Sequence, residues 1–462
     1  MKISFHGADR DVTGSCHMLE CAGRRILIDC GMFQGSRALA EENAAPFDFE
    51  PSTIDYVLLT HAHLDHCGRL PLLVKRGFRG EIIATSATAE LLRLVLLDAA
   101  HLQEEDAARA ASHRRRHGED PPAAPLYATP DALKCLDCLG RAAEYEKPFE
   151  FAPGLRATFF DAGHILGSAS ILIEAHEGDR IRSILFSGDV GNTGRPLLGP
   201  PSAPARADFV VMESTYGDRL HRSIADSIEE FYTAIGDATA RGGNILIPTF
   251  ALERAQELLY VLHQGIESSR LAPALQVFLD SPMAISATEI FEHHLECLDP
   301  STAAQIRQGH DPLALPNLHL TRQTADSIAI NRISGGAIIM AGSGMCTGGR
   351  IRQHLRHNLW RKESAVIFVG FAASGTLARQ IIDGAKHVRI FGEDVPVRST
   401  VHTINGFSAH ADQRELLAWR NGISGCQATF LVHGEESTMK ALSDRLQSGR
   451  VEMPRAGEAF DL

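Results

Sequence analysis

The first part of the chain alternates short apolar runs with polar turns. Apolar segments of four to eight residues, bounded by glycine and polar side chains, are typical of β-strands. Between residues 90 and 120 the pattern becomes helical and rich in alanine, and it ends in the basic sequence SHRRRHGEDPP. The predicted strands lie within residues 2–8, 24–31, 54–61, 80–87, 155–175, 180–191 and 207–217.

After Glu213 the rhythm changes to a regular alternation of strand and helix. Strand 244–250 leads into helix 251–264, and strand 275–282 leads into helix 283–295. Apolar strands alternating with amphipathic helices predict a mostly parallel sheet covered on both faces. A β-rich stretch then returns near residue 387. We therefore expect one α/β domain, formed by residues 1–212 and 392–462, that is interrupted by an inserted α/β domain at residues 213–391.

Length and composition agree with a soluble protein of several domains. At 462 residues the chain exceeds the usual size of one core. The hydrophobic share of 44% and the charged share of 22% are ordinary for globular proteins. The N-terminus lacks an apolar signal core, and no segment approaches the ~18 apolar residues of a membrane span. We expect a cytoplasmic protein without a membrane partner.

The net charge of −12 argues against binding of nucleic acid over the whole surface, although it leaves room for a local basic groove. The arginines and histidines of residues 113–117 form the densest basic cluster. This cluster either contacts a polyanion or is an exposed helix end before a loop, and the sequence alone leaves both interpretations open.

Nine cysteines, an odd number, do not resemble a disulfide framework. Cys135 and Cys138 form a C-x-x-C pair inside a predicted helix. No second pair accompanies them, and a structural zinc site needs four ligands. We interpret them as packed thiols.

The stretch THAHLDHCG, residues 60–68, is the strongest chemical signal in the chain. His61, His63, Asp65 and His66 follow a predicted strand. Imidazole and carboxylate are ligands for a metal such as zinc. Side chains two residues apart point the same way only in extended chain, and the next two ligands turn toward a second position. Two neighbouring ions would use the whole set.

Three further ligand-type residues each follow a predicted strand and lie near glycine. They are His164 in GHILGSAS, Asp189 in FSGDVG and His433 in LVHGE. Because functional residues of layered α/β folds gather at strand ends, we expect these residues to complete the metal site.

These segments together resemble the metallo-β-lactamase superfamily and, within it, the β-CASP branch of nucleases. THAHLDHCG, GHILGSAS and FSGDVG are similar to the metal motifs of that superfamily, while ESTYG, GFSAHAD and LVHGE are similar to the motifs that mark β-CASP. The resemblance spans residues 2–445 and implies an αββα sandwich with an inserted β-CASP domain. The chain is most similar to compact bacterial relatives of the polyadenylation cleavage endonuclease.

The resemblance implies two zinc ions per chain. His61, His63 and His164 would hold one ion, and Asp65, His66 and His433 the other, with Asp189 bridging both. Asp29 would lie behind the ligands and orient a histidine.

The resemblance also assigns a proton donor. His410 would act as general acid and Glu213 would be its carboxylate partner, with Asp412 as an alternative partner. The inserted domain would contact the substrate. The residues we expect to bind substrate are Gly344, Arg350, Ser374 and Gly375.

We therefore expect a zinc-dependent ribonuclease that acts on single-stranded RNA. The histidine at position 433 favours RNA over DNA within the family. The alternatives are a metallohydrolase of a small ester or thioester and a non-catalytic RNA-binding scaffold. The sequence leaves open the natural RNA, the balance of endonuclease and exonuclease cutting, and the oligomeric state, with a homodimer among the options.

Overall fold

The computed structural model describes the whole chain except residues 36, 118–119, 121–123, 179, 371, 374 and 448. The chain forms two compact units. Unit 1 consists of Met1–Thr193, Pro200–Leu220 and His410–Leu462, and unit 2 consists of Gly194–Gly199 and His221–Ala409.

Unit 1 contains two seven-stranded sheets. The strand order is β22-β1-β2-β3-β4-β5-β6 in the first and β21-β20-β11-β10-β9-β8-β7 in the second. The first sheet consists of β22 (Ala459–Asp461), β1 (Lys2–Phe5), β2 (His17–Cys21), β3 (Arg24–Ile28), β4 (Tyr56–Leu58), β5 (Glu81–Thr85) and β6 (Leu139–Ala143). The second consists of β21 (Arg450–Glu452), β20 (Ala428–Val432), β11 (Phe209–Glu213), β10 (Arg180–Phe186), β9 (Ala169–Glu177), β8 (Leu155–Asp161) and β7 (Phe149–Ala152).

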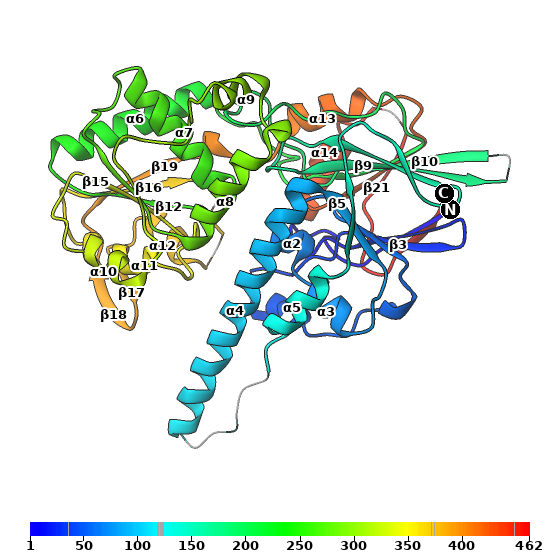
Figure 1. Cartoon of the computed structure of the whole chain (residues 1–462), viewed down its shortest axis with the longest axis horizontal. Coiled ribbons are helices and arrows are strands. Elements are labelled where there is room, and N and C mark those ends of the chain that lie inside the picture. Colours follow the sequence, from blue (N-terminus) through cyan, green and yellow to red (C-terminus); the bar gives the residue numbers. More distant parts are fainter. Residues whose placement is uncertain are drawn as a thin grey trace. The chain divides into compact units, whose positions relative to one another are not determined.

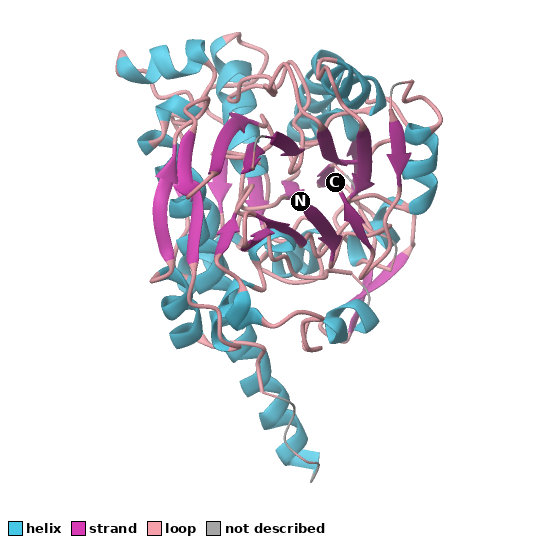
Figure 2. Ribbon diagram, turned by 90° about the vertical axis from the view of Figure 1, so that its right-hand side faces the viewer, coloured by secondary structure: helices cyan, strands magenta, loops and turns pink. Residues whose placement is uncertain are grey.

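The two sheets of unit 1 pack face to face. Phe5 and Leu19 of the first sheet share one buried cluster with Phe159, Ile171 and Phe430 of the second. Helices cover the outer faces, so Figure 2 shows strands in the middle and helices outside them. This is the predicted αββα sandwich. Its helices are α1 (Arg37–Glu42), α2 (Leu64–Cys67), α3 (Leu70–Lys75), α4 (Ser86–His117), α5 (Thr129–Leu136), α13 (Gln413–Asn421) and α14 (Glu436–Ser443).

Parallel pairing brings several strand ends of unit 1 to one edge. In the first sheet β3 and β4 run parallel, and in the second β10 runs parallel to β11 and β11 to β20. The carboxyl ends of parallel neighbours meet at the same side of a sheet. The loops that follow these strands carry the predicted ligand residues except His164, which follows β8; β8 runs in the same direction as β10, because both are antiparallel to β9 between them.

Unit 2 is built on one six-stranded parallel sheet of order β14-β13-β15-β12-β16-β19, as predicted for the inserted segment. Its strands are β12 (Ile245–Pro248), β13 (Gln276–Leu279), β14 (Leu318–Leu320), β15 (Ala337–Ala341), β16 (Ala365–Val369) and β19 (Thr400–Ile404), with a hairpin of β17 (His387–Ile390) and β18 (Glu393–Pro396). Its helices, each labelled in Figure 1, are α6 (Ile224–Ala240), α7 (Arg254–Glu267), α8 (Pro282–His293), α9 (Pro300–Arg307), α10 (Thr324–Ile330), α11 (Ile351–Asn358) and α12 (Leu377–Ile382).

The unit boundaries differ from the expected positions 213 and 391. The first part of unit 1 continues to Leu220, because β11 belongs to its second sheet. Unit 2 continues to Ala409, because β19 pairs in parallel with β16 over five residues. The β-rich look of residues 387–404 suggested a return to the first domain, whereas these residues form a hairpin and the edge strand of the unit 2 sheet.

Cys135 and Cys138 were expected to lie in one helix, but they do not. Cys135 is buried in α5, and Cys138 follows the end of that helix. Among the described residues, no group that could hold a metal ion includes a cysteine. The described part of the chain also contains no helix that is both long and apolar enough to cross a membrane.

A buried network of ion pairs connects the segment Gly194–Gly199 to the rest of unit 2. Arg195 is 7% exposed, and its Nε atom donates to Glu257 Oε1 at 3.3 Å. Its Nη2 atom lies 3.6 Å from Glu253 Oε1, and its Nη1 atom donates to the carbonyl oxygen of Ala409 at 3.4 Å. Arg254 pairs with the same Glu257 carboxylate. The network links the segment to the start of α7 and to the last residue of unit 2.

Replacing Arg195 by alanine is expected to destabilise unit 2 by about 1.5–3 kcal/mol, because it removes one of the two cations beside the buried Glu257 carboxylate and the cation beside Glu253. Hydrogen–deuterium exchange of α7 peptides measures the change. Arg270→Ala is the matched control, since Arg270 forms an exposed pair with Glu229 worth at most about 1 kcal/mol. Equal protection of α7 in both variants would contradict the prediction.

Candidate active site

Three imidazoles and one carboxylate of unit 1 converge on a common point. His61 Nε2 and His164 Nε2 lie 3.1 and 3.2 Å from His63 Nδ1. Asp189 Oδ2 lies 3.6 Å from His61 Nε2 and 3.5 Å from His164 Nε2. A tetrahedral zinc site with Zn–N bonds of about 2.0–2.1 Å separates neighbouring ligand atoms by about 3.3 Å. These four ligand atoms have that spacing.

A second group adjoins the first. Asp65, His66 and His433 each offer a ligand atom within 4.8 Å of the others. Asp65 Oδ2 lies 3.5 Å from His433 Nε2, and His66 Nε2 lies 3.3 Å from Asp189 Oδ1. The seven residues that the sequence predicted as ligands thus lie in two adjoining groups.

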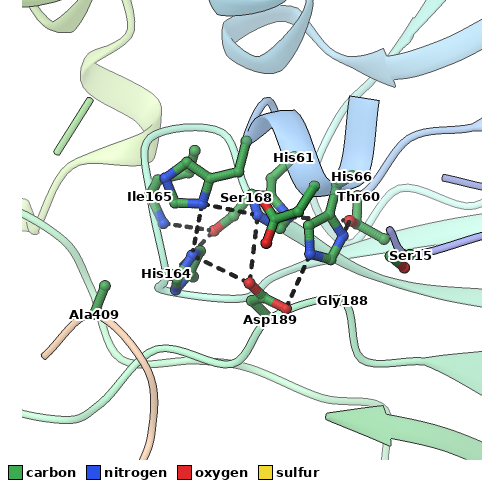
Figure 3. A network of polar contacts seen from close by, with 12 residues as sticks. Ser15, Thr60, His61, His66, His164, Ile165, Ser168, Gly188, Asp189 and Ala409 are labelled. Carbon is green, nitrogen blue, oxygen red and sulfur yellow. Dashed lines mark hydrogen bonds and ion pairs between the residues drawn. The ribbon is translucent and has the colours of Figure 1, made fainter. Parts of the chain in front are cut away.

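The Asp189 carboxylate belongs to both groups. Figure 3 shows its two oxygens directed to different imidazoles, one toward His61 and His164 and the other toward His66. Asp189 Oδ1, His66 Nε2 and His433 Nε2 are buried and make no hydrogen bond with any described residue. Buried polar atoms without a partner are costly, and a cation among them would satisfy all three. The donor set therefore fits metal ions.

The local chain explains how THAHLDHCG presents its ligands. The segment after β4 is extended up to His63, whose φ of −68° and ψ of 146° precede the short helix α2. Extended chain aims His61 and His63 to one side, and α2 turns Asp65 and His66 to the other. The i, i+2 spacing predicted this division.

The loop that carries His164 depends on glycine. Gly163 and Gly167 have φ of +62° and +77°. A Cβ at Gly167 would lie 2.6 Å from the backbone nitrogen of Thr88. Only glycine fits that close approach in the left-handed conformation, and the turn it allows brings His164 back to the site.

Asp29 lies behind the second group of ligands. Its Oδ2 atom is 2.7 Å from His66 Nδ1, and its Oδ1 atom accepts a 2.8 Å hydrogen bond from the Thr60 backbone nitrogen. A carboxylate at Nδ1 holds that proton in place and leaves the lone pair of Nε2 for a metal. The geometry is that of an orienting residue.

His410 and Glu213 form a pair beside the ligands. His410 Nδ1 lies 3.2 Å from both carboxylate oxygens of Glu213 and 3.9 Å from Asp189 Oδ2. Glu213 is fully buried, and its Oε1 atom accepts a 2.6 Å hydrogen bond from the Val190 nitrogen. The alternative partner Asp412 instead caps α13, where its side chain accepts from the Glu415 nitrogen at 3.0 Å.

Burial and charge shift the pKa values of the first ligand group and of His410 in opposite directions. Burial lowers the pKa of His61 and His164, and it lowers the pKa of His63 to about 4. These rings are therefore neutral, which is the form that binds a metal. Burial also opposes the charging of His410, but the Glu213 and Asp189 carboxylates outweigh it and raise its pKa to about 9.

Three hydroxyl groups support the site and were not predicted. Thr60 Oγ1 lies 2.8 Å from Asp29 Oδ2 and 3.1 Å from His61 Nδ1. Ser168 Oγ accepts from the His164 nitrogen at 3.0 Å, and Thr215 Oγ1 lies 3.2 Å from His433 Nδ1. Their only signal in the sequence is that they lie within the motifs THAHLDHCG, GHILGSAS and ESTYG.

The residues expected to bind substrate lie in unit 2. Gly344 follows β15, and a Cβ there would lie 2.8 Å from the ring of Phe250. Gly375 lies in the turn before α12 with a φ of +81°, and Ser374 is outside the described residues.

The guanidinium of Arg350 already makes hydrogen bonds inside unit 2. It donates to Asp280 Oδ1 at 2.7 Å and to the carbonyl oxygens of Thr321 and Arg322 at 2.9 and 2.7 Å. It therefore supports the turn after β15, and its contact with a phosphate stays a prediction.

Comparison with protein families identifies the fold. Residues 9–249, about half of the chain, match the model of the metallo-beta-lactamase superfamily. This chain belongs to that superfamily. Residues 255–381 match the Beta-Casp domain, which assigns the chain to the β-CASP branch, and residues 394–454 match the Zn-dependent metallo-hydrolase RNA specificity domain.

Relatives in the family include named RNA-related proteins. The chain is 41% identical to Ribonuclease TTHA0252 of Thermus thermophilus over 99% of both chains. It is 30% identical to Transcription termination factor FttA of Methanocaldococcus jannaschii, over 97% of this chain and 69% of that protein. A crystal structure of a protein of unknown function from Enterococcus faecalis shares the fold, with a TM-score of 0.58, 13% identity and coverage of 100% and 99% of the two chains.

Asp29→Asn is expected to weaken metal binding by about 10–100-fold, because the amide no longer fixes the His66 tautomer. Titration of the metal-free protein with zinc measures the change. Asp48→Asn is the matched control, since Asp48 accepts from His6 Nδ1 at 2.7 Å and belongs to neither ligand group. Equal zinc affinity in the two variants would show that Asp29 does not support the metal ligands.

Proposed function

We propose that this chain is a zinc-dependent ribonuclease that hydrolyses phosphodiester bonds of single-stranded RNA. The observation that carries the proposal is the position of the His410–Glu213 pair beside two ligand groups that share Asp189. The match to an RNA specificity domain and the similarity to a protein named as a ribonuclease support RNA as the substrate.

In this proposal the two ligand groups hold two zinc ions. His61, His63 and His164 would hold one ion, and Asp65, His66 and His433 would hold the other, with the Asp189 carboxylate shared between them. Such a pair of cations, when bound, supplies a hydroxide nucleophile at neutral pH and neutralises charge on the phosphate. The three imidazoles of the first group support zinc over calcium or magnesium, which take six or more oxygen ligands.

His410 supplies the proton for the leaving oxygen. Glu213 engages Nδ1 of the ring, so the proton available for transfer is the one on Nε2. The buried Glu213 carboxylate favours the charged imidazolium and fixes the plane of the ring. Cleavage with this arrangement leaves a 3′-hydroxyl and a 5′-phosphate, as the family resemblance implies.

RNA is preferred over DNA because position 433 is histidine, as in the RNA-processing members of the branch. Gly344, Arg350, Ser374 and Gly375 remain the proposed substrate contacts of unit 2. Contacts of this kind with phosphates position the strand without reading its sequence.

His410→Gln is expected to lower RNA cleavage by about 10²–10⁴-fold and to retain zinc, because a general acid contributes a factor of this size. The measurement uses single-stranded RNA and DNA labelled at either end, with metal analysis of the same samples. His387→Gln is the matched control, since His387 makes an exposed 2.7 Å bond to Asp394.

A chelator is expected to abolish cleavage, and added zinc to restore it. Full cleavage by His410→Gln would refute the role of general acid. An absence of RNA cleavage by the zinc-loaded protein would favour the small-ester hydrolase or the RNA-binding scaffold instead.

A further inference from the structure

Helix α4 carries a feature that the active site does not use. The helix spans 32 residues, or about 48 Å at 1.5 Å per residue. Its buried side chains all lie between Ala87 and Ala100. Beyond them Glu104 still accepts two hydrogen bonds from Thr129, at 3.2 and 2.7 Å. Figures 1 and 2 show the following turns extending away from the rest of unit 1.

The projecting end of α4, residues 107–117, is strongly basic. Its sequence AARAASHRRRH contains four arginines and two histidines and no acidic residue, in a chain whose net charge is −12. Arg109 pairs with Glu105 and Asp106, which precede the arm, so the excess of positive charge lies in Arg114, Arg115 and Arg116. Residues 112–117 are all exposed. Arg116 donates to the uncharged Ser112 hydroxyl at 3.2 Å. We call residues 107–117 the basic arm.

Helix capping does not account for the whole basic arm. A cation in the last turn complements the helix dipole and contributes about 0.3–1 kcal/mol. Three consecutive arginines exceed that requirement, and like charges on one turn repel each other. Most helices gain their stability from a packed apolar face, which the arm lacks. The concentration of charge therefore points to an anionic partner.

We propose that the basic arm binds the phosphate backbone of single-stranded RNA outside the active site and so strengthens the binding of long substrates. The proposal rests on the proposed ribonuclease function, which brings RNA to this chain. Guanidinium groups pair well with phosphate oxygens. The rings of His113 and His117 stack with centroids 4.4 Å apart, so the arm also offers a flat face on which a base can stack.

The composition of the basic arm favours RNA over a protein partner. Protein interfaces depend on large apolar or aromatic anchors. The uncharged residues of the arm are alanine and serine, and the nearest large apolar side chain that is exposed, Leu102, lies outside it. A surface of this kind suits the repeating charge of a nucleic-acid backbone.

The test compares the zinc-loaded wild type with the triple variant Arg114→Gln, Arg115→Gln, Arg116→Gln. Glutamine removes the charge and keeps a similar helix propensity, and circular dichroism checks the helix. The probes are uridine oligonucleotides of about 30 and about 6 nucleotides, since only the longer one reaches beyond one single-strand binding site of about 4–16 nucleotides. Fluorescence anisotropy gives the affinity with His410→Gln added to both proteins, so that the RNA stays intact, and a separate assay without that substitution gives the cleavage rate of the short probe.

The variant is expected to bind the long probe at least about tenfold more weakly at about 50 mM salt. The slope of log affinity against log salt concentration should fall in magnitude by about 2, because each of the three lost cations releases about 0.7 counterion from a single strand. Its cleavage of the short probe should equal that of the wild type. Arg→Lys at the same three positions should restore affinity, because lysine keeps the charge.

The control variant removes three exposed arginines elsewhere in unit 1, Arg24, Arg180 and Arg445, and should leave the salt slope within about 1 of the wild type. If the arm variant bound the long probe with the same affinity and the same salt slope as the wild type, the proposal would be wrong, and a protein would become the expected partner of the basic arm. Wild type that binds the long probe through the arm but does not cleave it would refute the ribonuclease function alone.

Discussion

The Asp189 carboxylate is the constraint on which the site depends, because its two oxygens face two different groups of imidazoles 3.3–3.6 Å away. A buried carboxylate can serve both groups only if they approach from opposite sides. The fold meets this condition because β10 lies in the second sheet between β8, which precedes His164, and β20, which precedes His433. Asp29 and Glu213 then hold the Nδ1 atoms of His66 and His410, so that the buried charges alternate with imidazoles across the site.

Much of this arrangement could be predicted from local patterns. The short apolar runs bounded by turns located β1, β3, β4 and β5, and the spacing of His61 and His63 correctly indicated extended chain followed by a turn. The alternation of strand and helix after Glu213 predicted the parallel sheet of unit 2. These features are local, because a strand or a short loop fixes its own side-chain directions.

Features that depend on distant pairing were harder to predict. Nothing in the sequence of β19 distinguishes an edge strand beside β16 from a strand of the first domain, so the end of unit 2 was expected 18 residues too early, at 391 instead of 409. The pairing of Glu213 with His410 joins residues 197 positions apart and came from resemblance alone. The support given by Thr60, Ser168 and Thr215 has no pattern of its own, since a hydroxyl beside a histidine is common in any chain. The contact of Arg195 with Glu257 has no signal in the sequence either, because only the fold brings these two residues together.

The order of the chain has a consequence for its synthesis. The first sheet of unit 1 is completed by β22, which pairs with β1 over residues 2–4 and 459–461, and His433 follows β20. The sheet of unit 2 is formed entirely from residues between these ends. As the chain leaves the ribosome, unit 2 can therefore close while β1 still lacks β22 and the ligand groups still lack His433. The long loop between β1 and β22 makes that last pairing slow. A nascent chain thus exposes His61, His63 and His66 well before their site is complete, and it acquires a full set of ligands only after β20 and His433 have been made.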